Sequence, residues 1–310
     1  MPLYLTEMDV GGLIDIGTAV EALAAVFMSL AKAAAINHPR RRYRLIDGQL
    51  NVMLAADGLS RRFALKAYGG SGVSCHHVLL YSADEGLLAI IEAGLLGQIR
   101  TGAASGLATR LLARPEARRL GLIGAGRQAR TQLLAVAHVR PLESVDVFAR
   151  DGSRLEAFCA LMRKETGLPV RPAASARAAV EAADIVVTAT KAASPVIAAA
   201  WLRAGMHVNT IGANAAARQE LEAEAFAGAV MIVVDDVEQA RTEAGELIEL
   251  ARQDRLDWSR VRALADIVAE PPVKRHGITI FKSLGTAIED LAAASIVYDR
   301  AMQAGIGAKV

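Results

Sequence analysis

Residues 121–129 read Gly-Leu-Ile-Gly-Ala-Gly-Arg-Gln-Ala. Hydrophobic periodicity predicts a short strand over Leu120–Ile123 and a helix over Gln128–His138. Glycines between a strand and a helix allow a tight turn and let backbone N–H groups approach a pyrophosphate at the helix N-terminus. We interpret the loop as a dinucleotide-binding turn, with Ala129 in the third glycine position of GxGxxG. The alternative interpretation is a tight turn with a structural role only.

The sequence after Arg114-Pro115 alternates between apolar strands and amphipathic helices, which predicts a parallel sheet covered on both faces. Further strands are predicted at Val145–Phe148, Ile185–Thr188, His207–Ile211, Val230–Val234 and Ile278–Phe281. Further helices are predicted at Ser153–Lys164, Ala176–Ala182, Glu238–Ala251 and Arg260–Val268. This part of the chain therefore has the pattern of a doubly wound α/β (Rossmann) domain.

The first 115 residues have a different pattern. Strand-like segments flank the turns at Asp57-Gly58 and Asp84-Glu85-Gly86, and helices are predicted at Thr18–Ala35 and Ala93–Leu112. We expect a mostly antiparallel α+β unit, with the last helix, Ala287–Ala304, packed back onto it.

Composition excludes several classes of protein. The chain has 310 residues, 22% charged residues and a net charge of only +2, so it lacks the basic surplus of a nucleic-acid-binding protein. Its two cysteines, Cys75 and Cys159, form no zinc or disulfide pattern. The N-terminus does not resemble a signal peptide, and the apolar stretch Ala19–Ile36 contains two charges. We expect a cytoplasmic protein without a metal, nucleic-acid or membrane partner.

The residues after the second strand of the dinucleotide unit distinguish between cofactors. NAD enzymes usually carry an acid there, which binds the ribose hydroxyls. Here that position is Ala149, and Arg150, Ser153 and Arg154 follow. Two guanidinium groups and a hydroxyl can hold a 2′-phosphate, which favours NADP over NAD. The alternative is that Arg150 is a solvated cation and Asp151 binds the ribose.

Basic side chains in the first part of the chain are candidates for binding an anionic substrate. If residues 40–44 are extended, Arg40, Arg42 and Arg44 share one face and could clamp a carboxylate; a solvated edge is the alternative. Lys66 lies in the apolar strand predicted at Arg62–Tyr68. It is either at an edge or directed into a pocket, where a desolvated amine can act on a carbonyl, imine or carboxylate.

Three further segments of this part of the chain contain candidate functional residues. Gly69-Gly70-Ser71-Gly72 could approach a ligand closely. Arg100 and Thr101 could meet a phosphate or a substrate, although small residues around them are also typical of close helix packing. The adjacent His76 and His77 should face opposite sides of a strand.

Together these residues resemble the ornithine cyclodeaminase/mu-crystallin family over nearly the whole chain. The matching segments are Tyr4–Thr6, Val52-Met53, Lys66, Ile99–Ser105, Gly121–Gln128, Asn209–Gly212, Phe281–Gly285 and Glu289–Leu291. The resemblance implies a Rossmann domain over residues 116–285, and a discontinuous α+β substrate-binding and dimerisation domain over residues 1–115 and 286–310. It also implies a homodimer with a tightly held NAD(P).

The resemblance implies roles for individual residues. Lys66 matches the active-site lysine, and Arg100 matches an arginine that reaches the substrate carboxylate and the cofactor. Arg40 or Arg42 matches a second carboxylate-binding arginine. The resemblance implies cofactor contacts at Arg100, Thr190 and Ser283, and it places Leu284 near the substrate. The other cofactor contacts that we expect follow from the residues discussed above: Thr101, Gly124, Ala125, Gly126, Arg127, Gln128, Arg150, Ser153 and Arg154.

One departure from the family pattern affects the predicted reaction. Cyclodeaminases carry an aspartate as the proton-transfer group where this chain has Asn214, and a lysine where it has Arg218. An amide does not titrate and cannot act as a general acid or base. His77 likewise stands where cyclodeaminases have a cofactor-contacting threonine.

The resemblance and this departure leave three hypotheses. The leading one is an NAD(P)H-dependent reductase of a 2-imino acid or cyclic ketimine, which in reverse is an amino-acid dehydrogenase. The alternatives are an ornithine cyclodeaminase, which converts L-ornithine to L-proline and ammonia with bound NAD, and a non-enzymatic NADP-dependent ligand binder.

Overall fold

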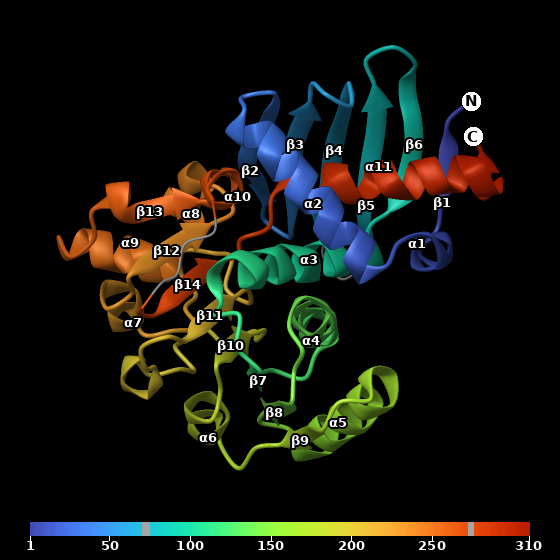
Figure 1. Cartoon of the computed structure of the whole chain (residues 1–310). Coiled ribbons are helices and arrows are strands. Elements are labelled where there is room, and N and C mark those ends of the chain that lie inside the picture. The colour runs from blue at the N-terminus through green and yellow to red at the C-terminus, as the bar shows by residue number, and fades with distance from the viewer. Residues whose placement is uncertain (70–74, 272–275) are drawn as a thin grey trace. The chain divides into compact units, whose positions relative to one another are not determined.

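The computed structural model describes residues 1–69, 75–271 and 276–310 (Figure 1). The chain divides into two compact units. Unit 1 comprises Met1–Ala104 and Gly285–Val310, and unit 2 comprises Ser105–Leu284. The sequence prediction placed the corresponding divisions at residues 115 and 285, whereas the first division of the structure falls within helix α3 (Gly94–Leu112).

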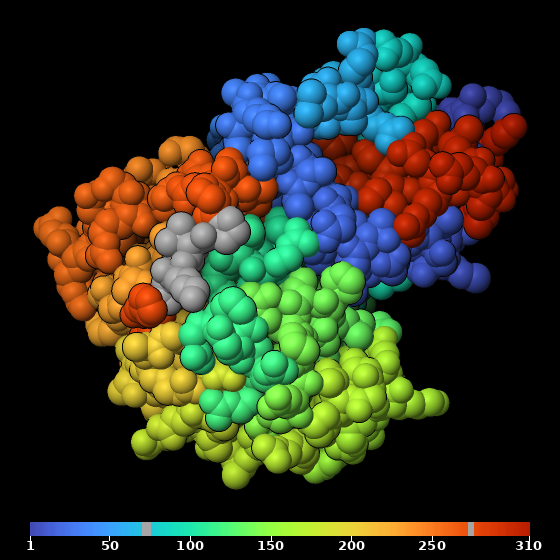
Figure 2. Space-filling model, in the orientation of Figure 1, coloured from blue at the N-terminus to red at the C-terminus, as the bar shows by residue number. Residues whose placement is uncertain are grey.

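Unit 1 is built on a sheet that has seven strands among the described residues, in the order β15-β1-β6-β5-β4-β3-β2. The strands are β1 (Leu3–Leu5), β2 (Ala35–Leu45), β3 (Gly48–Asp57), β4 (Arg62–Gly69), β5 (Cys75–Ser82), β6 (Gly86–Glu92) and β15 (Ala308–Lys309). β1 and β6 are parallel, and the other neighbours are antiparallel. The predicted antiparallel character is thus confirmed. The pairing of β1 with β15 brings the two termini together, and Figure 2 shows both at the surface.

Helices α2 (Ile16–Ala31) and α11 (Ala287–Ala304) cover one face of this sheet, and α11 contacts β3, β4 and α2 (Figure 1). The predicted packing of the last helix onto the first part of the chain is confirmed. Helix α11 begins with a capping box between Thr286 and Glu289, and its first two turns are completely buried. Glu289 and Asp290 are therefore carried into the interior of unit 1 by the helix that closes it.

The N-terminus of α3 is capped by a residue far away in sequence. The carboxylate of Glu7, in α1 (Glu7–Leu13), accepts hydrogen bonds of 2.6 Å from the backbone N–H groups of Gly94 and Leu95. A carboxylate satisfies the unpaired N–H groups of a first turn and complements the helix dipole. This contact fixes the start of the helix that carries Arg100.

Unit 2 contains a parallel sheet, which has eight strands among the described residues, in the order β13-β12-β14-β11-β10-β7-β8-β9. The strands are β7 (Arg119–Ile123), β8 (Ser144–Phe148), β9 (Val170–Pro172), β10 (Ile185–Thr188), β11 (His207–Thr210), β12 (Met231–Val234), β13 (Val261–Ala263) and β14 (Thr279–Lys282). The chain crosses from β7 to β8 and back to β10, so the switch in strand order lies next to the glycine-rich loop. Ligands of doubly wound sheets bind at this kind of position.

Alternate residues of the parallel strands face two separate cores. In β10, Val186 belongs to one hydrophobic cluster, whereas Ile185 and Val187 belong to the other. The first cluster is completed by residues of α6 (Ala176–Glu181), α7 (Ala223–Ala227), α8 (Val237–Glu243) and α9 (Gly245–Arg252), and the second by residues of α4 (Arg127–Val139) and α5 (Gly152–Thr166). Both faces of the sheet are buried, which explains its nearly continuous apolar strands.

Two predicted helices of unit 2 differ in the structure. The helix predicted at Glu238–Ala251 is broken at Ala244 into α8 and α9. A Cβ at Gly245 would collide with the carbonyl oxygens of Ala216 and Arg218, so the backbone is packed closely against another loop at the break.

The segment predicted as a helix over Arg260–Val268 contains a short 3-10 helix (Trp258–Arg260), strand β13 and helix α10 (Leu264–Ala269). β13 forms because it pairs with β12, a long-range contact that local periodicity cannot reveal.

The described residues contain neither a membrane-spanning helix nor a cluster of metal ligands. No single helix is long and apolar enough to cross a membrane; α1 and α2 meet the length and composition criteria only as a pair bent by 85°. Within the same residues, no group of three or more His, Cys, Asp or Glu side chains is arranged to hold a metal ion.

Candidate active site

Lys66 lies in the interior of unit 1. It is on β4, between Met53 of β3 and Val78 of β5, and its side chain is only 4% exposed. Its Nζ donates a 2.7 Å hydrogen bond to Oδ1 of Asp290 in α11. Of the two positions that the sequence allowed for this lysine, an edge or the interior, the structure has the interior one.

Arg100 joins Lys66 on the same carboxylate. Its Nε donates to Oδ1 of Asp290 over 3.1 Å, and its Nη1 donates to Oε2 of Glu289 over 2.7 Å. The other oxygen of Glu289 accepts from the hydroxyl of Thr286 over 2.9 Å. Lys66, Arg100, Glu289 and Asp290 therefore form a buried ionic cluster, a term kept below for these four residues.

Arg40 lies beside this cluster. Its Nη2 donates a 2.8 Å hydrogen bond to the carbonyl oxygen of Gly285. Gly285 has φ +73°, and a Cβ at this position would collide with the guanidinium of Arg100. Glycine is thus required here both by the backbone conformation and by the close approach of Arg100.

The basic run on β2 becomes steadily more exposed along the strand. Arg40 is buried, Arg42 is half-buried and Arg44 is exposed. The pairing of β2 with β3 shifts register between His38 and Arg41, which is a local irregularity of the ladder. Nη1 of Arg42 lies 3.5 Å from Oδ1 of Asn51. Arg40 is therefore the arginine of the run that lies next to the buried ionic cluster.

Burial and neighbouring charges shift the pKa values of the cluster. Burial lowers the pKa of Lys66, and Arg100 and Arg40 act in the same direction, while Asp290 opposes them. Burial alone would raise the pKa of Asp290, but Arg100 and Lys66 outweigh it and hold that pKa below its usual range. Burial raises the pKa of Glu289. With Arg40, three cationic side chains meet two carboxylates, so the site favours an anionic ligand.

The sheet face beside Lys66 carries further polar residues that sequence reasoning did not select. Asn51 pairs with Tyr68, and Tyr68 pairs with His76, in a row across three strands. The rings of Tyr68 and His76 stack with centroids 5.1 Å apart, and Nζ of Lys66 lies 5.7 Å from the Tyr68 ring centroid. Alternate residues of a strand face the same side, so the sequence could have identified Tyr68 from its position two residues after Lys66. Apart from Gly69, the loop predicted at residues 69–72 lies outside the described residues.

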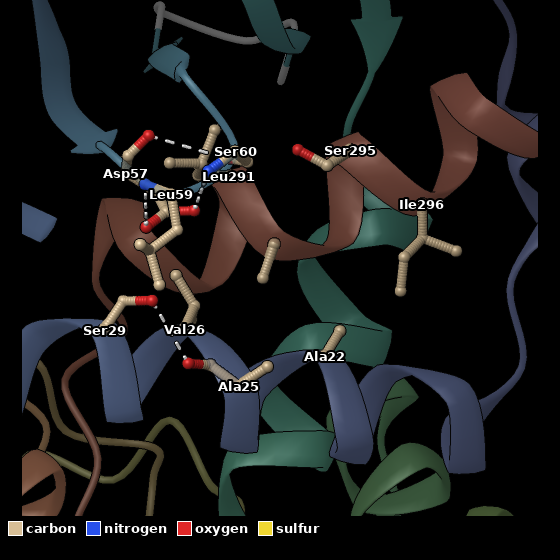
Figure 3. Close-up of a pocket in the computed structure, with 11 residues that line it drawn as sticks. Ala22, Ala25, Val26, Ser29, Asp57, Leu59, Ser60, Leu291, Ser295 and Ile296 are labelled. Atoms are coloured by element: carbon tan, nitrogen blue, oxygen red, sulfur yellow. Dashed lines mark hydrogen bonds between the residues drawn. The ribbon is translucent and has the colours of Figure 1, made fainter. Parts of the chain in front are cut away.

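A separate hollow in unit 1 does not match this site. It has a volume of about 380 Å³ and lies between α2, α11 and the turn after β3 (Figure 3). Its lining is largely apolar, and Asp57 is the charged residue in it. Asp57 already accepts from the backbone N–H groups of Leu59 and Ser60 within its own turn. Neither cations nor a catalytic group face this hollow, so we assign the chemistry to the buried ionic cluster.

The glycine-rich loop in unit 2 has the geometry that a dinucleotide requires. Gly124 has φ +119°, and a Cβ there would collide with the carbonyl oxygen of Ala189. Gly126 is the N-cap of α4 and provides no side-chain cap. A Cβ at Gly126 would meet only the guanidinium of Arg154, at 3.7 Å. The first turn of α4 therefore presents uncapped N–H groups beside a cation, which fits the pyrophosphate of NAD(P). Of the other predicted loop contacts, Arg127 is exposed, whereas Ala125 and Gln128 are half-buried.

Arg150, Ser153 and Arg154 are all exposed near the end of β8 and the start of α5. Nε of Arg154 donates to the carbonyl oxygen of Ala125 over 3.1 Å, which fixes Arg154 against the glycine-rich loop. Asp151 is the N-cap of α5, and its Oδ1 accepts from the backbone N–H of Arg154 and from the hydroxyl of Ser153. These hydrogen bonds, led by that of the Arg154 N–H, lower the pKa of Asp151.

A buried carboxylate that the sequence did not reveal organises the ends of two strands in unit 2. Oε1 of Glu220 accepts from the backbone N–H and the hydroxyl of Thr190, both over 2.7 Å. Oε2 accepts from the hydroxyls of Thr188 and Thr210 and from the N–H of Gly212. Glu220 thus ties β10 to β11 just where both strands end. The threonines at these strand ends are hydroxyl donors, and they could have indicated from the sequence that a buried acceptor lies nearby.

The remaining residues predicted from the sequence lie in different environments. The hydroxyl of Ser283 and the backbone N–H of Leu284 donate to Asp235, and the Leu284 side chain is buried in a core cluster of unit 2. Asn214 is half-buried in the loop that follows β11. The hydroxyl of Thr101 donates to the carbonyl oxygen of Gly97 within α3, over 2.7 Å.

Comparison with known proteins identifies the family to which this chain belongs. The model of the ornithine cyclodeaminase/mu-crystallin family matches residues 2–305. The chain belongs to this family. The predicted family and the predicted fold class, a Rossmann sheet with a second α+β part, are both confirmed.

Three similar proteins illustrate the chemistry within the family. A Δ1-pyrroline-2-carboxylate reductase of Bacillus cereus is 37% identical over 227 residues, which cover 72% of this chain and 70% of that protein. The structure of the Thermococcus litoralis Δ1-pyrroline-2-carboxylate reductase, with NADH and L-proline, is 32% identical, has a TM-score of 0.94 and covers 99% and 100% of the two chains.

An archaeal alanine dehydrogenase dimer with bound NAD is 29% identical, has a TM-score of 0.92 and covers 100% of this chain and 98% of that one. The predicted class, an enzyme that depends on NAD(P) and reduces imines, agrees with these relatives. The two solved structures contain NADH and NAD, respectively, so they support NAD(P) dependence without selecting NADP.

Proposed function

We propose that this protein is an NAD(P)H-dependent reductase of a 2-imino acid or a cyclic ketimine, which in reverse oxidises an amino acid. The observation that carries the proposal is the buried ionic cluster of Lys66, Arg100, Glu289 and Asp290, with Arg40 beside it. A buried ammonium next to guanidinium groups suits a substrate in which a carboxylate and a basic nitrogen are bonded to the same carbon.

Arg40, Arg100 and Lys66 each have a part in the proposed reaction. Arg40 and Arg100 bind the substrate carboxylate and fix its orientation. The ammonium of Lys66 donates a proton to the imine nitrogen, which becomes the amine nitrogen of the product. When bound, the nicotinamide cofactor supplies the hydride that reduces the carbon next to the carboxylate.

Unit 2 supplies the proposed cofactor site. The backbone of Gly124, Ala125, Gly126, Arg127 and Gln128 would hold the pyrophosphate at the N-terminus of α4. We propose Thr190 and Ser283 as further contacts with the cofactor. Glu220 would keep Thr190 and the Gly212 loop in place, because it binds both of them.

The polar groups of unit 1 favour reduction over cyclisation of a diamino acid. A second ammonium group on the substrate would need an acidic partner. The carboxylates that contact the cations of the cluster, Glu289 and Asp290, are already paired with Arg100 and Lys66. Asn214 in addition provides an amide where a cyclodeaminase needs a titrating carboxylate.

The function is tested by following NAD(P)H absorbance while the protein is mixed with candidate imines. The panel contains cyclic ketimines, and 2-oxo acids together with ammonia or methylamine. L-Ornithine, with proline and ammonia assayed as products, is the comparison. We expect oxidation of NAD(P)H by at least one imine. Proline formation without net cofactor change would instead establish the cyclodeaminase, and cofactor binding without any turnover would establish a ligand binder.

We also propose that the protein prefers NADPH to NADH, because Arg154 lies against the glycine-rich loop and position 149, where NAD enzymes usually carry an acid, is an alanine followed by Arg150. Replacing Arg154 by alanine should raise the Kd for NADPH by about tenfold or more, since a charged hydrogen bond to phosphate contributes about 1.5–3 kcal/mol. The Kd for NADH should stay nearly unchanged.

Fluorescence titration of both cofactors measures this difference in affinity. Lys164→Ala, on the exposed surface of the same helix, is the control for general electrostatic effects. An equal loss of affinity for the two cofactors in the Arg154 variant, or a wild-type preference for NADH, would contradict the proposed NADP preference.

We propose that the chain forms a homodimer through the face of the unit 1 sheet that α11 does not cover. Tyr43, Leu50, Leu54 and Phe63 on β2, β3 and β4 are each 44% exposed or more. Exposed apolar surface of this kind marks interaction sites. Light scattering should give a dimer mass for the wild type and a monomer mass for Leu54→Glu, whereas Met302→Glu, at the exposed end of α11, should remain dimeric. A monomeric wild-type protein would contradict this assignment.

A further inference from the structure

We infer that Asp290 of α11 is the positioning residue of this site: it fixes the ammonium of Lys66 and the guanidinium of Arg100 on one carboxylate oxygen and keeps the ammonium charged until its proton is transferred. The inference rests on the proposed reductase function for its chemistry. The contact itself joins residues 224 positions apart and is independent of any substrate.

The hydrogen bonds of Asp290 distinguish it from the buried carboxylate of Glu220. Lys66 and Arg100 both donate to Oδ1, whereas Oδ2 is buried and has no hydrogen-bond partner among the described residues. Glu220 offers the comparison within the same chain, because it is equally buried and both of its oxygens accept hydrogen bonds. Incomplete satisfaction of a buried polar group is costly, so the Oδ2 of Asp290 calls for a physical explanation.

The charges around Lys66 show what Asp290 contributes. Lys66 faces Arg100 from α3, Arg40 from β2, Tyr68 from its own strand and Asp290 from α11. Burial and the two guanidinium groups favour the neutral amine, and Asp290 favours the ammonium. Asp290 in turn is held charged by Arg100 and Lys66 and lies next to Glu289. Asp290 is thus the group in this set that keeps Lys66 able to donate a proton.

The proton balance of the proposed reduction uses this property. One N–H bond of the Lys66 ammonium breaks as an N–H bond forms on the substrate nitrogen, and hydride from NAD(P)H forms the new C–H bond. Lys66 is left as a neutral amine and regains a proton from water before the next turnover. A carboxylate in contact with Nζ favours this reprotonation.

The first test needs no substrate. Lys66 is labelled with a small amine reagent over a range of pH, and the extent of labelling of its peptide is measured by mass spectrometry. In Asp290→Asn the midpoint of Lys66 labelling should fall by at least about one pH unit, because the ammonium loses its only acidic contact in this set. Exposed Lys164 should label identically in every variant, as an internal reference.

The structure provides a matched control. Asp299 is also on α11 and pairs with Arg62, which is on the same strand as Lys66, but the side chain of Asp299 is 49% exposed. Asp299→Asn should leave the Lys66 midpoint unchanged, whereas Asp290→Glu should restore it toward the wild-type value. If Asp290→Asn does not fold, Asp290→Ser leaves room for water and serves the same purpose. If Asp290→Asn or Asp290→Ser gives the wild-type midpoint of Lys66 labelling, the inference is wrong.

A second measurement separates this inference from the proposed function. Imine reduction needs the charged lysine, so kcat/KM should fall as pH rises through the Lys66 pKa. The alkaline limb of that profile should move to lower pH in Asp290→Asn by about the shift found in labelling. If the Lys66 labelling midpoint shifts in Asp290→Asn but no imine of the panel oxidises NAD(P)H, the positioning role is supported and the reductase function is rejected. Turnover with unshifted labelling and an unshifted alkaline limb would reject the positioning role and keep the reductase.

Discussion

Replacing Lys66 by methionine should lower kcat/KM for imine reduction by about 10²–10⁴-fold, the range expected when a general acid is removed. Methionine has a similar length and tolerates a buried position, but it carries no proton to donate and no charge for Asp290. The affinity for NAD(P)H should stay within about twofold, because Lys66 is not among the residues proposed to hold the cofactor.

Initial rates measured with a substrate found in the imine panel, and fluorescence titration of the cofactor, test both parts of this prediction. Lys66→Arg separates charge from proton transfer, because arginine keeps the charge but does not release its proton near neutral pH; it should also be slow. Arg62→Met, at the half-buried first residue of the same strand, is the control and should retain near wild-type turnover, because Arg62 pairs with Asp299 and not with the buried ionic cluster. Normal activity in Lys66→Met would remove this residue from the mechanism.

Replacing Glu220 by alanine should lower the free energy of unfolding by about 3 kcal/mol or more. The substitution leaves several buried donors of β10, β11 and the loops after them without an acceptor, and each such group costs about 1–3 kcal/mol. The affinity for NAD(P)H should fall at the same time, because Thr190 and Gly212 lose the group that holds them.

Urea unfolding measures the loss of stability, and cofactor titration of the folded fraction measures the loss of affinity. Glu224→Ala is the control, because Glu224 makes an exposed pair with Arg255; exposed pairs of this kind contribute about 0–1 kcal/mol. A Glu220 variant as stable as this control would show that water replaces the lost acceptor. Full stability together with unchanged cofactor affinity would contradict the proposed role of Glu220.

Periodicity predicted the architecture well because it reports local burial. The glycine-rich loop, the alternation of strands and helices after it, and the antiparallel hairpins before it were all readable along the chain. Where a break depended on a remote contact, periodicity failed: the turn at Gly245 reflects its approach to the Ala216–Arg218 loop, and β13 depends on pairing with β12.

The residues of the candidate site likewise fall into those that the sequence revealed and those that only the folded structure revealed. Lys66 stood out as a charge within an apolar strand, and Arg40 and Arg100 stood out as cations in suggestive segments. Their assigned roles remain predictions. Neither Asp290 nor Glu220 could be assigned a partner from sequence, because both lie among ordinary helix or loop residues and meet their partners only after the chain has folded.

The sequence by itself determined the two kinds of sheet, the dinucleotide turn, the family and the cations available to bind an anion. These follow from side-chain period, glycine placement and residue type, which are local properties. Only the tertiary structure decided which carboxylate meets Lys66, that Arg40 rather than Arg44 is buried beside it, and which group ties β10 to β11. These contacts depend on strand register and helix packing, which bring together residues that are far apart in the chain.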